Sequence, residues 1–158
     1  MFLDFFMAAR GFSLIELITV LIIIGILGAV AAATFRDTGE IQTRGFYEEL
    51  LSASRHARTV AAASGCETRI RIDSSEYEVM QRADCDDGSF DVAVINPGRG
   101  EPFAGEVPSA ITVTVDGDNS VIFDALGAAD GGMEVTVSRG GFSRAFTLHE
   151  ATGFSERQ

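Results

Sequence analysis

An acidic side chain lies inside a long apolar run near the start of this 158-residue chain. Between Phe12 and Phe35 the only ionisable side chain is that of Glu16. Inserting a carboxylate into the apolar layer of a membrane costs about 3 kcal/mol, and in that layer the carboxylate is strongly attracted to any cation within reach. The run therefore predicts an ion pair between Glu16 and a partner group. The alternative is a simple membrane anchor with Glu16 near the interface, where charge is cheaper.

Two clusters of oxygen-bearing side chains have residue types that bind Ca²⁺. Their members are Asp84, Asp86 and Asp87 in one cluster and Asp116, Asp118 and Asn119 in the other. Neither cluster has the regular spacing of a Ca²⁺-binding loop, so we predict solvated turns. His56 and His149 have no Cys or carboxylate at metal-ligand spacing. Because the chain also contains no nucleophile elbow, P-loop or dinucleotide-binding glycine motif, we expect no metal, no cofactor and no enzyme activity.

The charge balance excludes one class of partner. The chain has a net charge of −11, with 12 arginines, no lysine and 23 acidic residues. Binding to nucleic acid requires clustered cations that contact phosphates, so we expect no nucleic-acid partner. A chain of this length has room for one long helix and one modest globular domain.

Two helical segments precede the globular part. At about 1.5 Å per residue, a helix over residues 12–35 is long enough to span the hydrocarbon core of a membrane, which is about 30 Å thick. Residues 36–65 continue as an amphipathic helix, because apolar side chains recur on one face at helical spacing. These are Phe46, Leu50, Ala53, Ala57, Val60 and Ala61. Gly65 is placed to end the helix, so we expect one continuous helix from Phe12 to Ser64.

Residues 66–158 change to the period of two that is typical of strands. The predicted strands are 67–72, 77–82, 90–95, 111–116, 121–125, 133–138 and 143–150, with Asp, Asn, Ser and Gly turns between them. The first two strands form a hairpin. Ile111, Val113 and Val115 alternate with threonines, which predicts one wet face and one face packed on the helix. The predicted fold class is therefore α+β, with a long N-terminal α-helix packed against a C-terminal antiparallel β-sheet.

The segment Gly11-Phe12-Ser13-Leu14-Ile15-Glu16-Leu17 resembles the N-terminal signal of type IV pilins and of the pseudopilins of type II secretion. The resemblance implies that residues 1–11 are a leader, that a prepilin peptidase cuts between Gly11 and Phe12, and that the new amine on Phe12 is methylated. It also implies that Glu16 meets this amine of a neighbouring subunit during filament assembly. Translation from Met7 would give a shorter, basic leader, and we hypothesise that residues 1–6 are an over-extended start.

Further patterns sharpen this resemblance. Phe123-Asp124-Ala125-Leu126-Gly127 and the closing Thr152-Gly153 are similar to elements of the minor pilins of the GspH/FimT group, as is the Arg- and Ala-rich stretch 53–61. The pair Cys66 and Cys85 is similar to that of MSHA-type minor pilins. Because both cysteines lie in the part that would be exported, we expect a disulfide between them, which would contribute about 3 kcal/mol. Two free thiols, or half of a metal site, are the alternatives.

One connection between the predicted strands is unusually long. Residues 96–109 hold all three prolines of the chain and three of its glycines. Connections of this length are often functional or mobile. Phe103 at the centre is either a contact residue or a core side chain. We expect this loop, with Asn96, Pro97, Phe103 and Pro108, to offer a surface to a partner.

These patterns together imply a minor pilin or pseudopilin with a type IV pilin-like fold. Such a chain is made as a single-pass inner-membrane precursor with its C-terminal domain in the periplasm. Prepilin peptidase processes it, and an inner-membrane assembly platform adds it to other pilin subunits, at or near the tip of a type IV pilus. One alternative is a minor pseudopilin of a type II secretion system. An alternative of another class is a membrane-anchored periplasmic binding module that does not polymerise.

Overall fold

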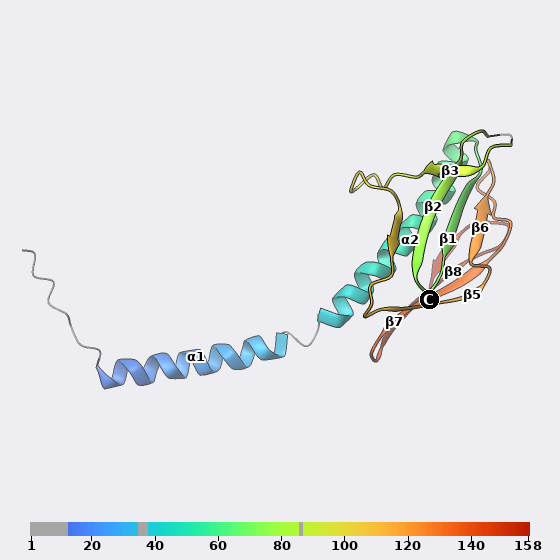
Figure 1. Cartoon of the computed structure of the whole chain (residues 1–158). Helices are drawn as coiled ribbons and strands as arrows, with labels where there is room; N and C mark the ends of the chain where they lie inside the picture. Colours follow the sequence, from blue (N-terminus) through green and yellow to red (C-terminus); the bar gives the residue numbers. More distant parts are fainter. Residues whose placement is uncertain (1–12, 35–37, 86) are drawn as a thin grey trace, which may run out of the picture. The chain divides into compact units, whose positions relative to one another are not determined.

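The computed structural model describes residues 13–34, 38–85 and 87–158, and the chain divides into two compact units at Thr38–Gly39. Helix α1 (Leu14–Thr34) belongs to the first unit, and helix α2 (Thr38–Ser64) carries the chain into the second (Figure 1). We call the second unit, Gly39–Gln158, the head. The predicted continuity of the two helices depends on residues 35–37, which lie outside the described residues, so it stays a prediction.

One face of α2 supplies the centre of the core of the head. Its buried apolar side chains are Phe46, Tyr47, Leu50, Leu51, Ala53, Ala57 and Ala61. Val60, the remaining member of the predicted apolar face, packs against this core and is partly buried. The 3.6-residue periodicity of α2 therefore identified the buried face of the helix correctly.

The end of α2 is also where the sequence places it. Gly65 has a φ of +73°, a left-handed conformation that glycine adopts without the steric cost of a Cβ atom. Its N–H donates to the carbonyl of Ala61 at 2.9 Å. The helix thus ends on a glycine C-cap, as predicted.

The strands of the head form two antiparallel sheets, not the single sheet that was predicted. The first sheet has the order β3-β2-β1-β6, with β4 also paired to β2. Its strands are β1 (Thr68–Ile72), β2 (Glu76–Arg82), β3 (Phe90–Ala93), β4 (Ala104–Glu106) and β6 (Ser120–Phe123). The second sheet has the order β5-β7-β8-β9 and consists of β5 (Thr112–Gly117), β7 (Met133–Arg139), β8 (Phe142–Leu148) and β9 (Ser155–Arg157).

Helix α2 packs against both sheets (Figure 1). The ring of Phe46 meets the ring of Tyr77 on β2 edge to face, with 6.0 Å between the ring centroids. The ring of Tyr47, one residue further along the helix, meets Phe146 on β8 at the same centroid distance. Two consecutive aromatic residues of one helix therefore anchor the two sheets to a common core.

The chain changes sheet between β4 and β5, at the turn between β5 and β6, and again between β6 and β7. A Cβ atom on Gly117 would lie 2.7 Å from the carbonyl oxygen of Gly132, so the close approach of the two backbones admits only glycine there. The alternation of apolar residues predicts where strands lie, but it carries no information about which sheet each strand joins. This explains why a single sheet was the wrong expectation.

Two short strands were not predicted. Strand β4 lies inside the predicted loop 96–109, and β9 follows the turn at Thr152-Gly153. Both have three residues, and neither shows apolar alternation. Their pairing with β2 and β8 defines them, and a periodicity argument over four to eight residues cannot detect strands of this length.

Candidate assembly segment and the contacts that shape the head

Glu16 lies in the first turn of α1, where its side chain is exposed. The Ser13 carbonyl accepts hydrogen bonds from the N–H groups of Glu16 and Leu17, at 3.0 and 3.2 Å, and these bonds start the helix. A carboxylate in the first turn also interacts favourably with the positive end of the helix dipole. Glu16 is the only ionisable residue of α1.

Apart from Glu16 and Thr19, the described side chains of α1, over residues 14–29, are apolar or are those of glycine. Its exposed large side chains are Leu14, Ile15, Leu17, Ile18, Val20, Leu21, Ile22, Ile23, Ile24, Ile26 and Leu27. A helix that is apolar all round requires an apolar environment, either lipid or other helices. Among the described residues, no helix reaches the combination of length and hydropathy that marks a membrane span.

The predicted cleavage and methylation site, Gly11 and Phe12, lies outside the described residues. Its role therefore remains a prediction from the sequence.

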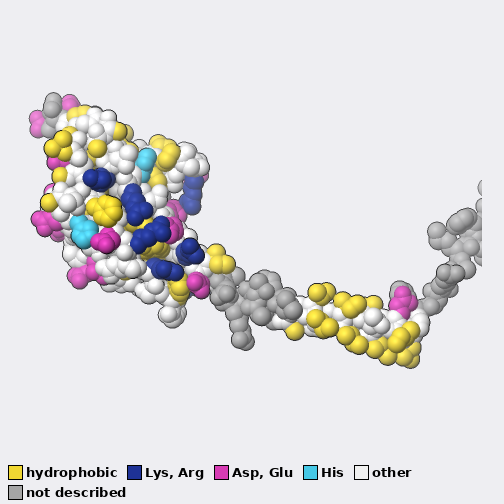
Figure 2. Space-filling model, turned by 180° about the vertical axis from the view of Figure 1, so that it is seen from behind, with side chains coloured by type: hydrophobic (Ala, Val, Ile, Leu, Met, Phe, Trp, Pro, Cys, Tyr) yellow, Lys and Arg dark blue, Asp and Glu magenta, His cyan; other side chains and the backbone are white. Residues whose placement is uncertain are grey.

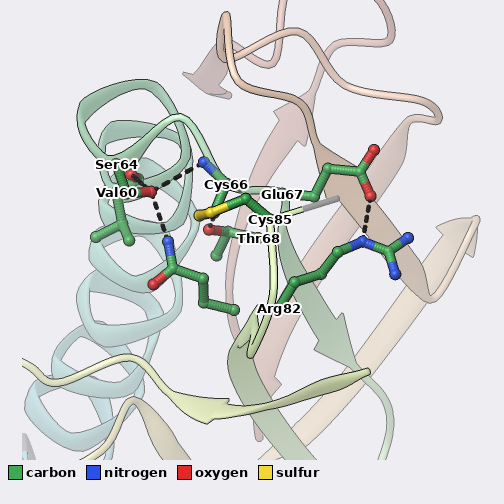
Figure 3. Close-up of a disulfide and its surroundings, with 8 residues drawn as sticks. Val60, Ser64, Cys66, Glu67, Thr68, Arg82 and Cys85 are labelled. Atoms are coloured by element: carbon green, nitrogen blue, oxygen red, sulfur yellow. Dashed lines mark hydrogen bonds and ion pairs between the residues drawn. A yellow bond between two sulfur atoms is a disulfide. The ribbon is translucent and has the colours of Figure 1, made fainter. Parts of the chain in front are cut away.

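Cys66 and Cys85 form a disulfide, with 4.5 Å between their Cα atoms (Figure 3). Cys66 follows the C-cap of α2, and Cys85 follows the end of β2. The bond therefore ties the end of the helix to the open end of the β1–β2 hairpin. The predicted pairing is the one observed, and the two alternatives of free thiols and half of a metal site are excluded for these cysteines.

Polar contacts around the disulfide support the same junction (Figure 3). The Ser64 hydroxyl donates to the carbonyl of Val60 at 2.7 Å and accepts a hydrogen bond from the side chain of Gln81 at 2.6 Å. Across the hairpin, Arg82 and Glu67 form an ion pair at 2.6 Å. The last turn of α2 is thus joined to β2 by the hydrogen bond between Ser64 and Gln81, and the disulfide joins the segments that follow the two elements.

The Phe123-Asp124-Ala125-Leu126-Gly127 stretch forms a turn that is held from within. One carboxylate oxygen of Asp124 accepts hydrogen bonds from the N–H groups of Leu126 and Ala128, each at 2.8 Å. The carbonyl of Gly127 accepts a further hydrogen bond from the guanidinium of Arg58 on α2, at 3.0 Å. The turn after β6 is therefore fastened to the helix.

The closing Thr152-Gly153 completes this arrangement. Gly153 has a φ of +62°, and a Cβ atom there would lie 2.5 Å from the carbonyl oxygen of Gly127 and 3.0 Å from the ring of Phe123. Phe123 itself is fully buried. The two patterns that carry the family resemblance are therefore in contact, and together they form a structural joint between α2, β6 and the C-terminal segment.

The predicted partner loop divides into a core part and a surface part. Phe103 is 2% exposed, and its N–H and carbonyl are hydrogen-bonded to Val94 and Val79, each at 2.8 Å. Of the two alternatives for Phe103, the core side chain is therefore the one observed, and this residue does not belong to the predicted partner surface. Pro97 and Pro108 are exposed and Asn96 is half-buried, and their role as a partner surface stays a prediction.

The same loop is pinned to α2 by an ion pair. The guanidinium of Arg99 makes two hydrogen bonds to the carboxylate of Glu49, at 2.9 and 3.3 Å. Glu49 also accepts a hydrogen bond from the Tyr77 hydroxyl at 2.5 Å. Burial, reinforced by this hydrogen bond, raises the pKa of Tyr77 well above the ordinary value of 10. The phenol therefore stays neutral at physiological pH and acts as a fixed donor.

The Asp-rich turns show no arrangement typical of a metal centre. In the part of the chain that the structure describes, no group of three or more His, Cys, Asp or Glu side chains is positioned to hold a metal ion. Asp86, a member of one predicted cluster, lies outside that part.

An apolar helix with one carboxylate in its first turn, followed by an amphipathic helix covered by antiparallel strands, defines the class of type IV pilin-like subunits. The family model described as type II transport protein GspH matches residues 47–152, which is more than half of the chain. The model for the prokaryotic N-terminal methylation motif matches residues 6–32. The chain therefore belongs to the GspH family, whose members are minor pilins and pseudopilins and act as structural subunits.

Solved structures agree with this fold. The minor pilin FimU of Pseudomonas aeruginosa matches with a TM-score of 0.54 and 13% identity, covering 77% of this chain and 91% of FimU. The minor pseudopilin EpsH of the Vibrio cholerae type 2 secretion system matches with a TM-score of 0.53 and 14% identity, covering 77% of this chain and 97% of EpsH. No curated protein matches the sequence significantly. At these identities the likeness establishes the α+β pilin fold that the sequence predicted.

Proposed function

We propose that this chain is a minor subunit of a filament that is assembled from the inner membrane. The observation that carries the proposal is α1: an otherwise apolar helix with a lone carboxylate, Glu16, in its first turn, in a chain that matches the N-terminal methylation motif. In this account prepilin peptidase cuts after Gly11, and Phe12 becomes the methylated N-terminus. Glu16 then neutralises the Phe12 amine of a neighbouring subunit.

The proposed organisation of the chain follows from these roles. Residues 1–11 are the leader, residues 12–35 are the membrane and assembly helix, residues 36–65 are its amphipathic continuation, and residues 66–158 form the sheet region of the head. The precursor is held in the inner membrane with the head in the periplasm, and the assembly platform passes it into the filament, at or near the tip.

The filament that we favour is a type IV pilus of the MSHA type. The disulfide between Cys66 and Cys85 supports this choice, because the cysteine pair resembles that of MSHA-type minor pilins. A second candidate is a type II secretion pseudopilus, which the match to the family of type II transport protein GspH favours. FimU and EpsH match the chain almost equally well in fold, so their likeness favours neither candidate.

Deleting this chain from its host tests the proposal. We expect loss of filaments and of surface attachment, normal export of secreted enzymes, and recovery of both lost properties when the intact chain is supplied. The chain should also appear in filaments sheared from the complemented cells. Loss of secretion with normal attachment would instead identify a pseudopilin. A head that stays with the membrane fraction, in cells whose filaments are normal, would mark a binding module that does not polymerise.

A further inference from the structure

The arginines of the head are distributed unevenly between its surfaces. Five of them lie along α2 and β9 or beside these elements, and we call this group the arginine stripe. Its members are Arg44, Arg55, Arg58, Arg144 and Arg157. On the face shown in Figure 2, basic side chains gather around hydrophobic ones. This concentration is notable in a chain whose net charge is −11.

The arginines inside and outside the stripe differ in their partners. Outside it, four of the five other arginines of the head form ion pairs with carboxylates of the same molecule; these are Arg69, Arg71, Arg82 and Arg99. Inside the stripe, Arg157 is the only one with an ion pair among the described residues, to Glu48 at 2.8 Å. Arg55 and Arg58 donate to neutral backbone carbonyls. The positive charge of the stripe is therefore largely uncompensated.

A small cavity lies at one end of the stripe. It has a volume of about 70 Å³ and is lined by Arg44, Arg144, Arg157, Tyr47, Glu48 and Gln158. Arg44 and Arg144 have no ion pair within the described part of the chain, and both are exposed. The phenol of Tyr47 donates to the carbonyl of Ala145 at 3.2 Å and closes the inner side of the cavity. Arg157 is already paired with Glu48 in this cavity, which leaves the guanidinium groups of Arg44 and Arg144 without a carboxylate partner in the described structure. A cavity of this size between two such groups suits one carboxylate group.

The other end of the stripe combines cations with an exposed aromatic ring. Arg55, Arg58, Phe154 and Ser155 line a second depression, of about 200 Å³. Phe154 is 54% exposed although it adjoins the buried Gly153 and Ser155. The guanidinium of Arg55 donates to the Ser155 carbonyl at 3.0 Å, which holds β9 along the helix. Arginine together with exposed aromatic side chains is the composition of residues that dominate protein interfaces.

We propose that the arginine stripe is a docking surface for a carboxylate-rich segment of the adjacent subunit in the filament. One carboxylate enters the cavity between Arg44 and Arg144, and an apolar side chain of the same segment covers Phe154. Charge complementarity favours this occupant, because uncompensated guanidinium groups attract carboxylates and fix the register of the contact. That the occupant is a neighbouring subunit rests on the proposed function. That the stripe binds carboxylates does not depend on the proposed function.

The chemistry is tested with the full chain in detergent micelles and a fluorescent peptide of ten glutamates as the probe. We expect binding that weakens as salt is raised and that falls at least tenfold in the double variant Arg44→Gln/Arg144→Gln. These two side chains make no ion pair in the described structure, and the cation–π contact of Arg144 with the ring of Phe142, at 5.3 Å from the ring centroid, lies at the surface, so the effect on the fold should be small. The matched control is Arg71→Gln/Arg139→Gln, which removes the same charge elsewhere and should change binding less than threefold. Equal losses in both variants, or no loss in either, would overturn the proposal.

A nucleic-acid role is a separate outcome of the same assay. A single-stranded DNA of ten nucleotides carries about the same negative charge as the peptide, so the net charge of the chain repels both probes alike. We expect the DNA to bind more weakly because the cavity of about 70 Å³ suits a single carboxylate group. Tighter binding of the DNA, abolished by Arg44→Gln/Arg144→Gln, would overturn the assignment to a protein partner.

A second experiment, which measures incorporation into filaments in cells, distinguishes failure of the docking surface from failure of the proposed function. In cells, Arg44→Glu/Arg144→Glu should be processed and retained at normal abundance, but its recovery in sheared filaments should fall at least fivefold relative to Arg71→Glu/Arg139→Glu. Normal incorporation of the stripe variant would refute the docking role. Absence of the unmodified chain from filaments would refute the proposed function instead, and the peptide assay would still report on the surface.

Discussion

The variant Glu16→Val is expected to enter the membrane normally and to be absent from filaments. Removing the carboxylate makes insertion of α1 easier by about 3 kcal/mol, so the abundance of the precursor should not fall. What is lost is the counter-charge for the Phe12 amine of the neighbouring subunit, which would otherwise stay unpaired in an apolar layer. We expect the recovery of the chain in sheared filaments to drop at least tenfold, as measured by immunoblotting of filament and membrane fractions.

A matched control lies one turn further along the same helix. Thr19 has a polar side chain whose hydroxyl donates to the carbonyl of Ile15 at 2.7 Å, inside its own helix. Because this hydroxyl has no unmet requirement for a partner, Thr19→Val should be incorporated like the unmodified chain. If Glu16→Val entered filaments as efficiently as Thr19→Val, the pairing role of Glu16 would be wrong.

The variant Gly153→Ala is expected to destabilise the head strongly. A methyl group there meets the carbonyl oxygen of Gly127 and the ring of the buried Phe123, in addition to a φ of +62° that favours glycine. Neither neighbour moves easily, since one is backbone and the other is core. We expect a loss of about 3 kcal/mol in the free energy of unfolding, measured by urea denaturation followed by circular dichroism.

Gly140→Ala is the control that separates the cost of backbone strain from the cost of the steric clash at Gly153. Gly140 has nearly the same φ, +61°, but no atom lies within 4 Å of the position of a Cβ. This variant should lose only about 1 kcal/mol, the cost of a side chain in the left-handed region. Equal losses in the two variants would show that strain alone matters, and the packing account of the joint between Phe123, Gly127 and Gly153 would then fail.

Much of the head could be predicted because its sequence signals are local. The apolar stripe of α2 requires only the helical period, and Gly65 requires only the rule for C-caps. The β1–β2 hairpin follows from two alternating stretches joined by a polar turn, and it has the expected register, with Ile72 opposite Tyr77. The disulfide then follows from the position of the cysteines at the open end of the hairpin.

The missed features depend on contacts between distant segments. The division into two sheets is set by pairings between strands that are not consecutive in sequence, such as β1 with β6 and β5 with β7. Strands β4 and β9 form by pairing with β2 and β8. The sequence left Phe103 as either a contact residue or a core side chain, because prolines and glycines surround it. The core around α2 decides the burial of Phe103. The centroid of the Phe103 ring lies 5.4 Å from that of the His56 ring on this helix.

The functional features of α1 could be inferred from the sequence more easily than those of the head. The proposed role of Glu16 rests on one charge in an apolar run, which a single sequence displays directly, and on the resemblance to the pilin signal; it stays a prediction. The contact between Gly127 and Gly153, and the convergence of Arg44, Arg144 and Arg157, join residues far apart in the chain. Nothing in the local sequence around these residues indicates that they meet.

The mass of the mature chain tests two parts of the proposed function together, the cut after Gly11 and the methylation of Phe12. We expect a protein that begins at Phe12 and is heavier than the unmethylated chain from Phe12 by one CH₂ unit, because a methyl group replaces a hydrogen. Fragmentation should locate this methyl group on the N-terminal amine. Gly11→Ala, as the control, should give only the uncut precursor. A mature chain that retains its leader, or one with an unmodified amine on a different first residue, would contradict the account.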